Sequence, residues 1–91
     1  MNGECEFSLS DGRKIKIILE HEGGFIKDIR FEGSEFIKPD GLTTQLADNL
    51  KWVQLNPVAL YTRIRFFQLK NSAEIEGTDS NKLAEAICDC S

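Results

Sequence analysis

The chain has 91 residues, of which 41% are hydrophobic and 29% charged, and its formal net charge is −4. A chain of this length forms one domain and can bury a modest core without disulfide staples. The acidic excess disfavours a general nucleic-acid-binding protein, because phosphate contacts need a basic surface. No run of 18 apolar residues is present, so the sequence predicts no membrane-spanning helix.

The first third of the chain alternates apolar and polar residues with the period of two that is typical of half-buried strands. Three such segments are predicted, at residues 5–9, 13–21 and 25–33. Their expected apolar faces are Cys5, Phe7 and Leu9, then Ile15, Ile17 and Leu19, then Phe25, Ile29 and Phe31.

Glycine-containing turns separate these segments and predict how they pair. Asp11-Gly12 and Glu22-Gly23-Gly24 supply residues that adopt the conformations of tight hairpin turns. The segments therefore form an antiparallel meander with one apolar face. Lys27 interrupts the apolar parity of the third segment, so we expect it near a strand end or at a β-bulge.

The rest of the chain has the spacing of helices that could cover this face. Asn56-Pro57 is typical of an N-cap followed by a first-turn proline, and Thr78-Asp79-Ser80 offers caps for a last helix. Residues 73–77 are an extended connector or a short edge strand. The predicted helical faces are Leu42, Leu46, Leu50 and Val53, then Leu60, Ile64 and Phe67 with Val58 and Tyr61 beside them, then Leu83, Ala86 and Ile87.

The order of elements is β-β-β-α-α-(β)-α, which predicts an α+β fold in residues 1–91. In this fold a three-stranded antiparallel meander packs against two to three helices.

Reactive side chains are few. His21 follows the second strand beside a turn, where an exposed turn residue is expected rather than a catalytic base. Cys88 and Cys90 are two potential metal ligands, but a closed zinc site needs four. We therefore predict no catalytic residue and no metal site. Because no secretory segment accompanies the three cysteines, they are interpreted as reduced thiols of a cytoplasmic protein, with Cys90 in a frayed terminus.

Hydrophobic residues in two places indicate a surface for a protein partner. One place is the loop after the third strand, where an aromatic and a carboxylate, Phe36 and Glu35, are expected to be presented. The other is the middle helix, where two adjacent phenylalanines cannot both face the core. The partner-binding candidates are Phe36, Ile37, Pro39, Phe66 and Phe67.

Three segments together resemble the accessory (C-terminal) domain of lipoate–protein ligases, which in some archaea is a separate small subunit. They are residues 11–33 (DGRKIKIILEHEGGFIKDIRFEG), 36–50 (FIKPDGLTTQLADNL) and 73–87 (AEIEGTDSNKLAEAI). The resemblance implies a non-catalytic subunit that docks on the catalytic ligase subunit as a heterodimer and enables lipoyl-AMP formation and lipoylation. It implies that ATP and lipoate bind the partner, that this chain binds no cofactor, and that it meets the lipoyl-acceptor protein only indirectly.

The topology also resembles iron–sulfur cluster scaffolds and sulfur-acceptor proteins, which gives an alternative function as a small iron–sulfur-scaffold or sulfur-carrier-like binding module. Those proteins carry reactive cysteines after the third strand and near the cap of the last helix. Here these places hold Ser34-Glu35-Phe36 and Thr78-Asp79-Ser80, without a thiolate to ligate iron or accept sulfur.

Overall fold

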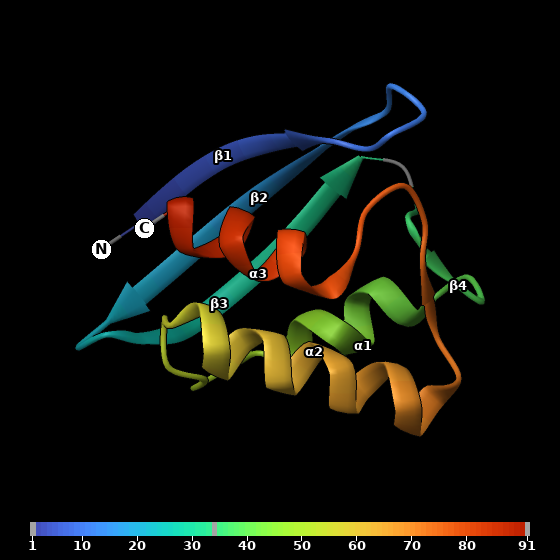
Figure 1. The fold of residues 1–91 in the computed structure, drawn as a ribbon. Helices are drawn as coiled ribbons and strands as arrows, with labels where there is room; N and C mark the ends of the chain where they lie inside the picture. The colour runs from blue at the N-terminus through green and yellow to red at the C-terminus, as the bar shows by residue number, and fades with distance from the viewer. Residues whose placement is uncertain (1, 34, 91) are drawn as a thin grey trace.

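A computed structural model describes residues 2–33 and 35–90; Ser34, which the sequence places in the loop after the third strand, lies outside this description. Strands β1 (Asn2–Ser8), β2 (Lys14–Glu22) and β3 (Phe25–Gly33) form an antiparallel sheet in the order β1-β2-β3 (Figure 1). The register pairs Phe7 with Ile15 and Ile17 with Phe31, so the predicted meander is confirmed.

A β-bulge in β3 changes which residues face the core. Glu20 pairs with Asp28 and His21 pairs with Ile26, so Lys27 is the extra residue, as its position in the pattern predicts. The expectation that Phe25 faces the core is wrong. The extra residue reverses the alternation, so Ile26 is fully buried and Phe25 is 45% exposed.

The described residues form three helices, α1 (Leu42–Asn49), α2 (Pro57–Asn71) and α3 (Ser80–Asp89). The side chain of Asn56 accepts hydrogen bonds from the backbone N–H groups of Val58 and Ala59, at 2.9 and 3.3 Å. The side chain of Asp79 accepts one from the N–H of Lys82, at 2.8 Å. Both caps satisfy donors that the first helical turn leaves unpaired, and both were predictable from residue type.

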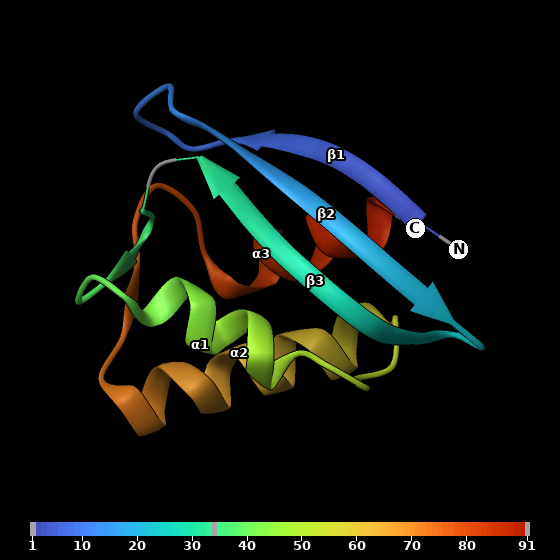
Figure 2. The ribbon, with the colours of Figure 1, turned by 180° about the vertical axis from the view of Figure 1, so that it is seen from behind.

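All three helices lie on one side of the sheet (Figures 1 and 2). Helix α1 packs against β3, and α2 packs against α3 and α1, on the side away from the strands. One long face of α2 is therefore not covered by any other element within the described residues. None of the helices in residues 2–33 and 35–90 is long and apolar enough to cross a membrane.

Two short strands, β4 (Ile37–Lys38) and β5 (Glu74–Ile75), join the loop before α1 to the connector before α3. The connector continues to Gly77, whose carbonyl accepts the N–H of Ser10 at 2.8 Å. Gly77 has a positive φ, and a Cβ there would lie 2.6 Å from Leu9 Cβ, so glycine is needed at this approach. Of the two predicted alternatives for residues 73–77, the short strand is the one that forms.

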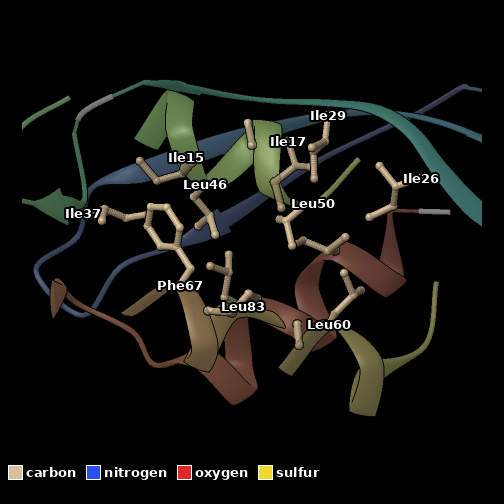
Figure 3. Close-up of a cluster of buried hydrophobic side chains, with 14 of the residues drawn as sticks. Ile15, Ile17, Ile26, Ile29, Ile37, Leu46, Leu50, Leu60, Phe67 and Leu83 are labelled. Atoms are coloured by element: carbon tan, nitrogen blue, oxygen red, sulfur yellow. The ribbon is translucent and has the colours of Figure 1, made fainter. Parts of the chain in front are cut away.

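The hydrophobic core lies between the sheet and the helices (Figure 3). Each fully buried aliphatic side chain contributes roughly 1.5–3 kcal/mol. The predicted faces agree with this core except at Phe25, Val58 and Tyr61, which are exposed, and at Ala86, which is partly buried where Ala84 is fully buried. Its fully buried members include Ile15, Ile17, Leu19, Ile26, Leu46, Leu50, Leu60, Ile64, Leu83 and Ile87.

Candidate functional site

The loop between β3 and α1 turns its hydrophobic side chains inward. Phe36 and Ile37 have no exposed surface, and the ring of Phe36 packs edge-on against Phe7 and Phe31, with centroids 5.7 and 5.6 Å apart. The expectation that this loop presents Phe36 and Ile37 to a partner is therefore wrong, because the domain's own core covers them. Pro39 is the partner-binding candidate of this loop that remains exposed.

Hydrogen bonds from two residues hold the loop in this position. The Arg13 guanidinium donates to the Glu35 carbonyl at 2.9 Å and to Glu76 Oε1 at 3.4 Å. The Thr43 hydroxyl donates to the Glu35 carboxylate at 2.9 Å. Glu35 therefore has a structural contact inside the domain, which the sequence pattern alone did not indicate.

The charges around this loop stabilise each other. The Arg13 guanidinium and backbone N–H both donate to the Asp11 carboxylate, at 2.7 and 3.0 Å. The backbone hydrogen bond is the largest cause that lowers the pKa of Asp11, and the pairing with Asp11 raises the pKa of Arg13. Lys38 Nζ lies 2.5 Å from Asp40 Oδ1, and this hydrogen bond raises the pKa of Lys38. These groups are ion-paired at neutral pH and are not arranged for acid–base catalysis.

Helix α2 separates the two adjacent phenylalanines. Phe67 belongs to the buried stripe with Leu60 and Ile64 and is 3% exposed, whereas Phe66 is 60% exposed. The prediction that one of the pair is exposed is confirmed, and Phe67 is corrected to a core residue. Val58 and Tyr61 are exposed as well.

A shallow groove lies beside Phe66, between α2 and the segment that follows α1. It is lined by Trp52, Val53, Gln54, Ala59, Thr62, Arg63 and Phe66. Trp52, which is 63% exposed, is not among the residues predicted to bind a partner. Trp52 lies beyond the end of α1, so the helical spacing of the preceding leucines does not determine which way its side chain faces.

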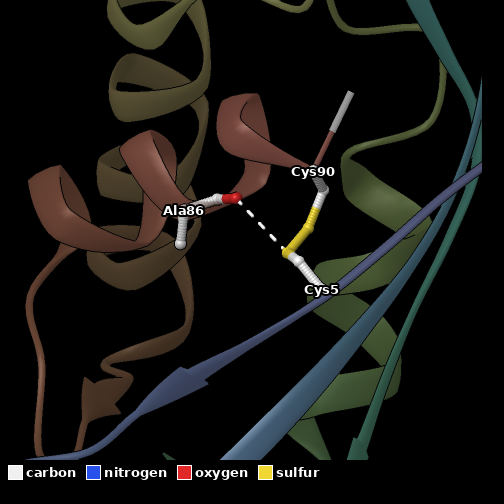
Figure 4. The surroundings of a disulfide bond; sticks show 3 residues. All are labelled: Cys5, Ala86 and Cys90. Atoms are coloured by element: carbon white, nitrogen blue, oxygen red, sulfur yellow. Dashed lines mark hydrogen bonds between the residues drawn. A yellow bond between two sulfur atoms is a disulfide. The ribbon is translucent and has the colours of Figure 1, made fainter.

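A disulfide joins Cys5 on β1 to Cys90 at the end of α3, with Cα atoms 5.4 Å apart (Figure 4). The interpretation of all three cysteines as reduced thiols is wrong for these two, and Cys90 is 6% exposed instead of frayed. Cys5 Sγ also lies 3.7 Å from the Ala86 carbonyl oxygen, which is a packing contact because a disulfide sulfur has no proton to donate. The sequence could not show that the two ends of the chain meet.

Cys88, which lies outside this disulfide, is not an activated nucleophile. Partial burial raises the pKa of its thiol, and the neighbouring charge of Asp89 raises it further. Reactive cysteines have a lowered pKa, so this environment disfavours sulfur transfer. Within residues 2–33 and 35–90, no three His, Cys, Asp or Glu side chains are grouped as a metal site. His21 lies on β2 at the bulge and is half-buried.

No protein-family model matches this chain, and no curated protein matches it by sequence. A chain of one solved structure superposes on it with a TM-score of 0.78 and 22% sequence identity. That structure is of an archaeal lipoylation system, a bipartite lipoate protein ligase and its E2 lipoyl domain, from Thermoplasma acidophilum. The match covers 96% of this chain and 94% of the other, so the two chains are of similar length. The predicted resemblance is thus confirmed as a shared fold.

Proposed function

We propose that this chain is the non-catalytic accessory subunit of a lipoate–protein ligase. In this role it forms a heterodimer with the catalytic subunit and enables that subunit to activate lipoate with ATP and to lipoylate an acceptor protein. The observation that carries the proposal is the fold shared, over nearly the whole length of both chains, with a component of a bipartite ligase system.

Two features of the described residues support a role in which the chemistry is supplied by a partner. The thiol of Cys88 is not activated, and Arg13 forms ion pairs with Asp11 and Glu76 inside the domain. We therefore assign the binding of ATP and lipoate, and the ligase chemistry, to the partner.

A population shift explains how such a subunit can accelerate a reaction without contributing a catalytic group. If it binds one arrangement of the partner's active-site loops more tightly than others, docking raises the share of that arrangement. The size of the acceleration is limited by this difference in affinity.

The direct test is lipoyl-AMP formation by the catalytic ligase chain of the same organism, with and without this protein. We expect the rate to rise with the concentration of this protein and then to saturate. An unrelated acidic protein of similar size is the control and should change nothing. Equal rates with and without this chain, at saturating ATP and lipoate, would end the proposal.

A further inference from the structure

Two parallel stripes run along α2, and they have different environments. Leu60, Ile64 and Phe67 form the buried stripe. One residue earlier at each step, the same spacing gives a second stripe of Ala59, Arg63 and Phe66, which lines the groove with Trp52. The second stripe therefore lies directly beside the core-facing one; Arg63 and Phe66 are exposed, and Ala59 is partly buried against the core.

Trp52 has a backbone conformation that residues with a large side chain rarely adopt. Its φ is 65°, in the left-handed region where glycine or asparagine is usual and a bulky side chain is an outlier. The conformation is fixed because the N–H of Trp52 donates to the Ile26 carbonyl at 2.5 Å and that of Val53 donates to the Leu50 carbonyl at 3.3 Å. A large aromatic side chain that is strained and 63% exposed buries little of its surface in the isolated domain, and such outliers cluster at functional sites, which points to a contact outside the domain.

The charge of α2 differs from that of the whole chain. The helix contains three basic residues, Arg63, Arg65 and Lys70, and no acidic one, although the chain's net charge is −4. Arg63 lines the groove, and no carboxylate of the described residues lies within ion-pairing distance of it. The groove thus combines two exposed aromatic rings with an unpaired positive charge.

We propose that the groove between Trp52 and Phe66 is the surface that binds the catalytic ligase subunit. The subunit contributes an apolar side chain seated between the two aromatic rings and a carboxylate that pairs with Arg63. This inference rests on the proposed function and names the docking surface for it. Tryptophan, tyrosine and arginine dominate the binding energy of protein interfaces, and an arginine fork holds a carboxylate through two parallel hydrogen bonds.

The test is the affinity of the catalytic ligase chain, measured by calorimetry, for five variants of this protein. Trp52→Ala and Phe66→Ala should each raise Kd about tenfold or more, because each removes a central aromatic contact. Tyr61→Ala is the matched control, because Tyr61 is exposed on α2 but does not line the groove. Its Kd should stay within about twofold of the wild type, as is usual for residues away from the contact.

The contact between Arg63 and a partner carboxylate is tested by Arg63→Glu. Arg65→Glu is the control, because it changes the net charge by the same amount at a position outside the groove. Arg63→Glu should weaken binding more than Arg65→Glu and should reduce its dependence on ionic strength. Equal losses for the two variants would show a non-specific charge effect and contradict the carboxylate contact.

Further outcomes separate the failure of this inference from that of the proposed function. If the wild type neither binds nor stimulates the ligase chain, both fail. If the wild type binds and stimulates the ligase chain, and the Trp52 and Phe66 variants bind with the same affinity, the docking surface is elsewhere and the proposed function stands. If the isolated protein is a dimer that Trp52→Ala makes monomeric, a second copy occupies the groove and the inference is overturned. Circular dichroism of each variant confirms that it is folded.

Discussion

Two regions of this molecule carry hydrophobic residues that the sequence predicts to be exposed, but the fold buries those of one region and exposes those of the other. The loop between β3 and α1 buries Phe36 and Ile37 completely, whereas α2 leaves Phe66 in solvent beside Trp52. The loop can turn inward because Arg13 and Thr43 hold its backbone and its carboxylate over the core. A rigid helix has no such freedom, so a second aromatic next to a buried one must stay outside.

The largest expected effect is the loss of stability on substituting Phe36. Phe36→Ala should lower the free energy of unfolding by about 3–5 kcal/mol, because it leaves a cavity between the rings of Phe7 and Phe31. Chemical denaturation of the two proteins measures this difference. A loss under about 1 kcal/mol would place Phe36 on the surface, where substitutions have small effects.

The next largest effect concerns the disulfide that links β1 to the end of α3. Cys5→Ser should destabilise the protein by about 2–4 kcal/mol, since the disulfide with Cys90 closes a loop of almost the whole chain. Thermal unfolding with and without reductant measures it, and reductant should affect the wild type but not the variant. Cys88→Ser is the control and should leave the effect of reductant unchanged. A wild type that is indifferent to reductant would contradict the link.

The uncovered region, which is the face of α2 that carries Phe66 together with Trp52 beside it, should contribute little to the stability of the domain. Phe66→Ala is expected to change the free energy of unfolding by no more than about 0.5 kcal/mol, because its ring is mostly in solvent already. The same denaturation experiment tests it beside Phe36→Ala. A loss as large as that of Phe36→Ala would mean that Phe66 packs within the domain and is unavailable to a partner.

The smallest expected effect concerns the ion pair that supports the loop. The pKa of Asp11 is lowered in the folded state, so its stabilisation is complete above the ordinary aspartate pKa of about 3.9. It is lost as the pH falls through the lowered value. Asp11→Asn should therefore have a slightly lower Tm than the wild type at neutral pH. The difference should shrink in acid, as a series of melting curves can show, and a difference that grows in acid would contradict the pairing.

The periodic parts of the chain could be predicted from the sequence, and the parts set by long-range contacts could not. The apolar faces of β1 and β2, the caps at Asn56 and Asp79 and the leucine spacing of α1 depend on local rules, and each was correct. The bulge at Lys27 was recognised as a break in parity, yet its consequence for Phe25 needs the pairing register.

The candidate site was predictable only in part, for the same reason. Phe66 follows from helical geometry and its neighbour Phe67. The burial of Phe36 depends on the hydrogen bond from Arg13 to the Glu35 carbonyl, between residues 22 positions apart in the chain. The position of Trp52 depends on a hydrogen bond to β3, and no local pattern encodes either contact.

The most direct measurement uses Trp52, the chain's single tryptophan, as a probe of the uncovered region. This protein is labelled with 5-fluorotryptophan, mixed with the unlabelled catalytic ligase chain, and followed by fluorine NMR. The account predicts that the one resonance shifts on binding and becomes shielded from a soluble paramagnetic quencher, because a partner side chain covers the ring. Binding that leaves the resonance and its accessibility unchanged would contradict the claim that this face is where another protein docks.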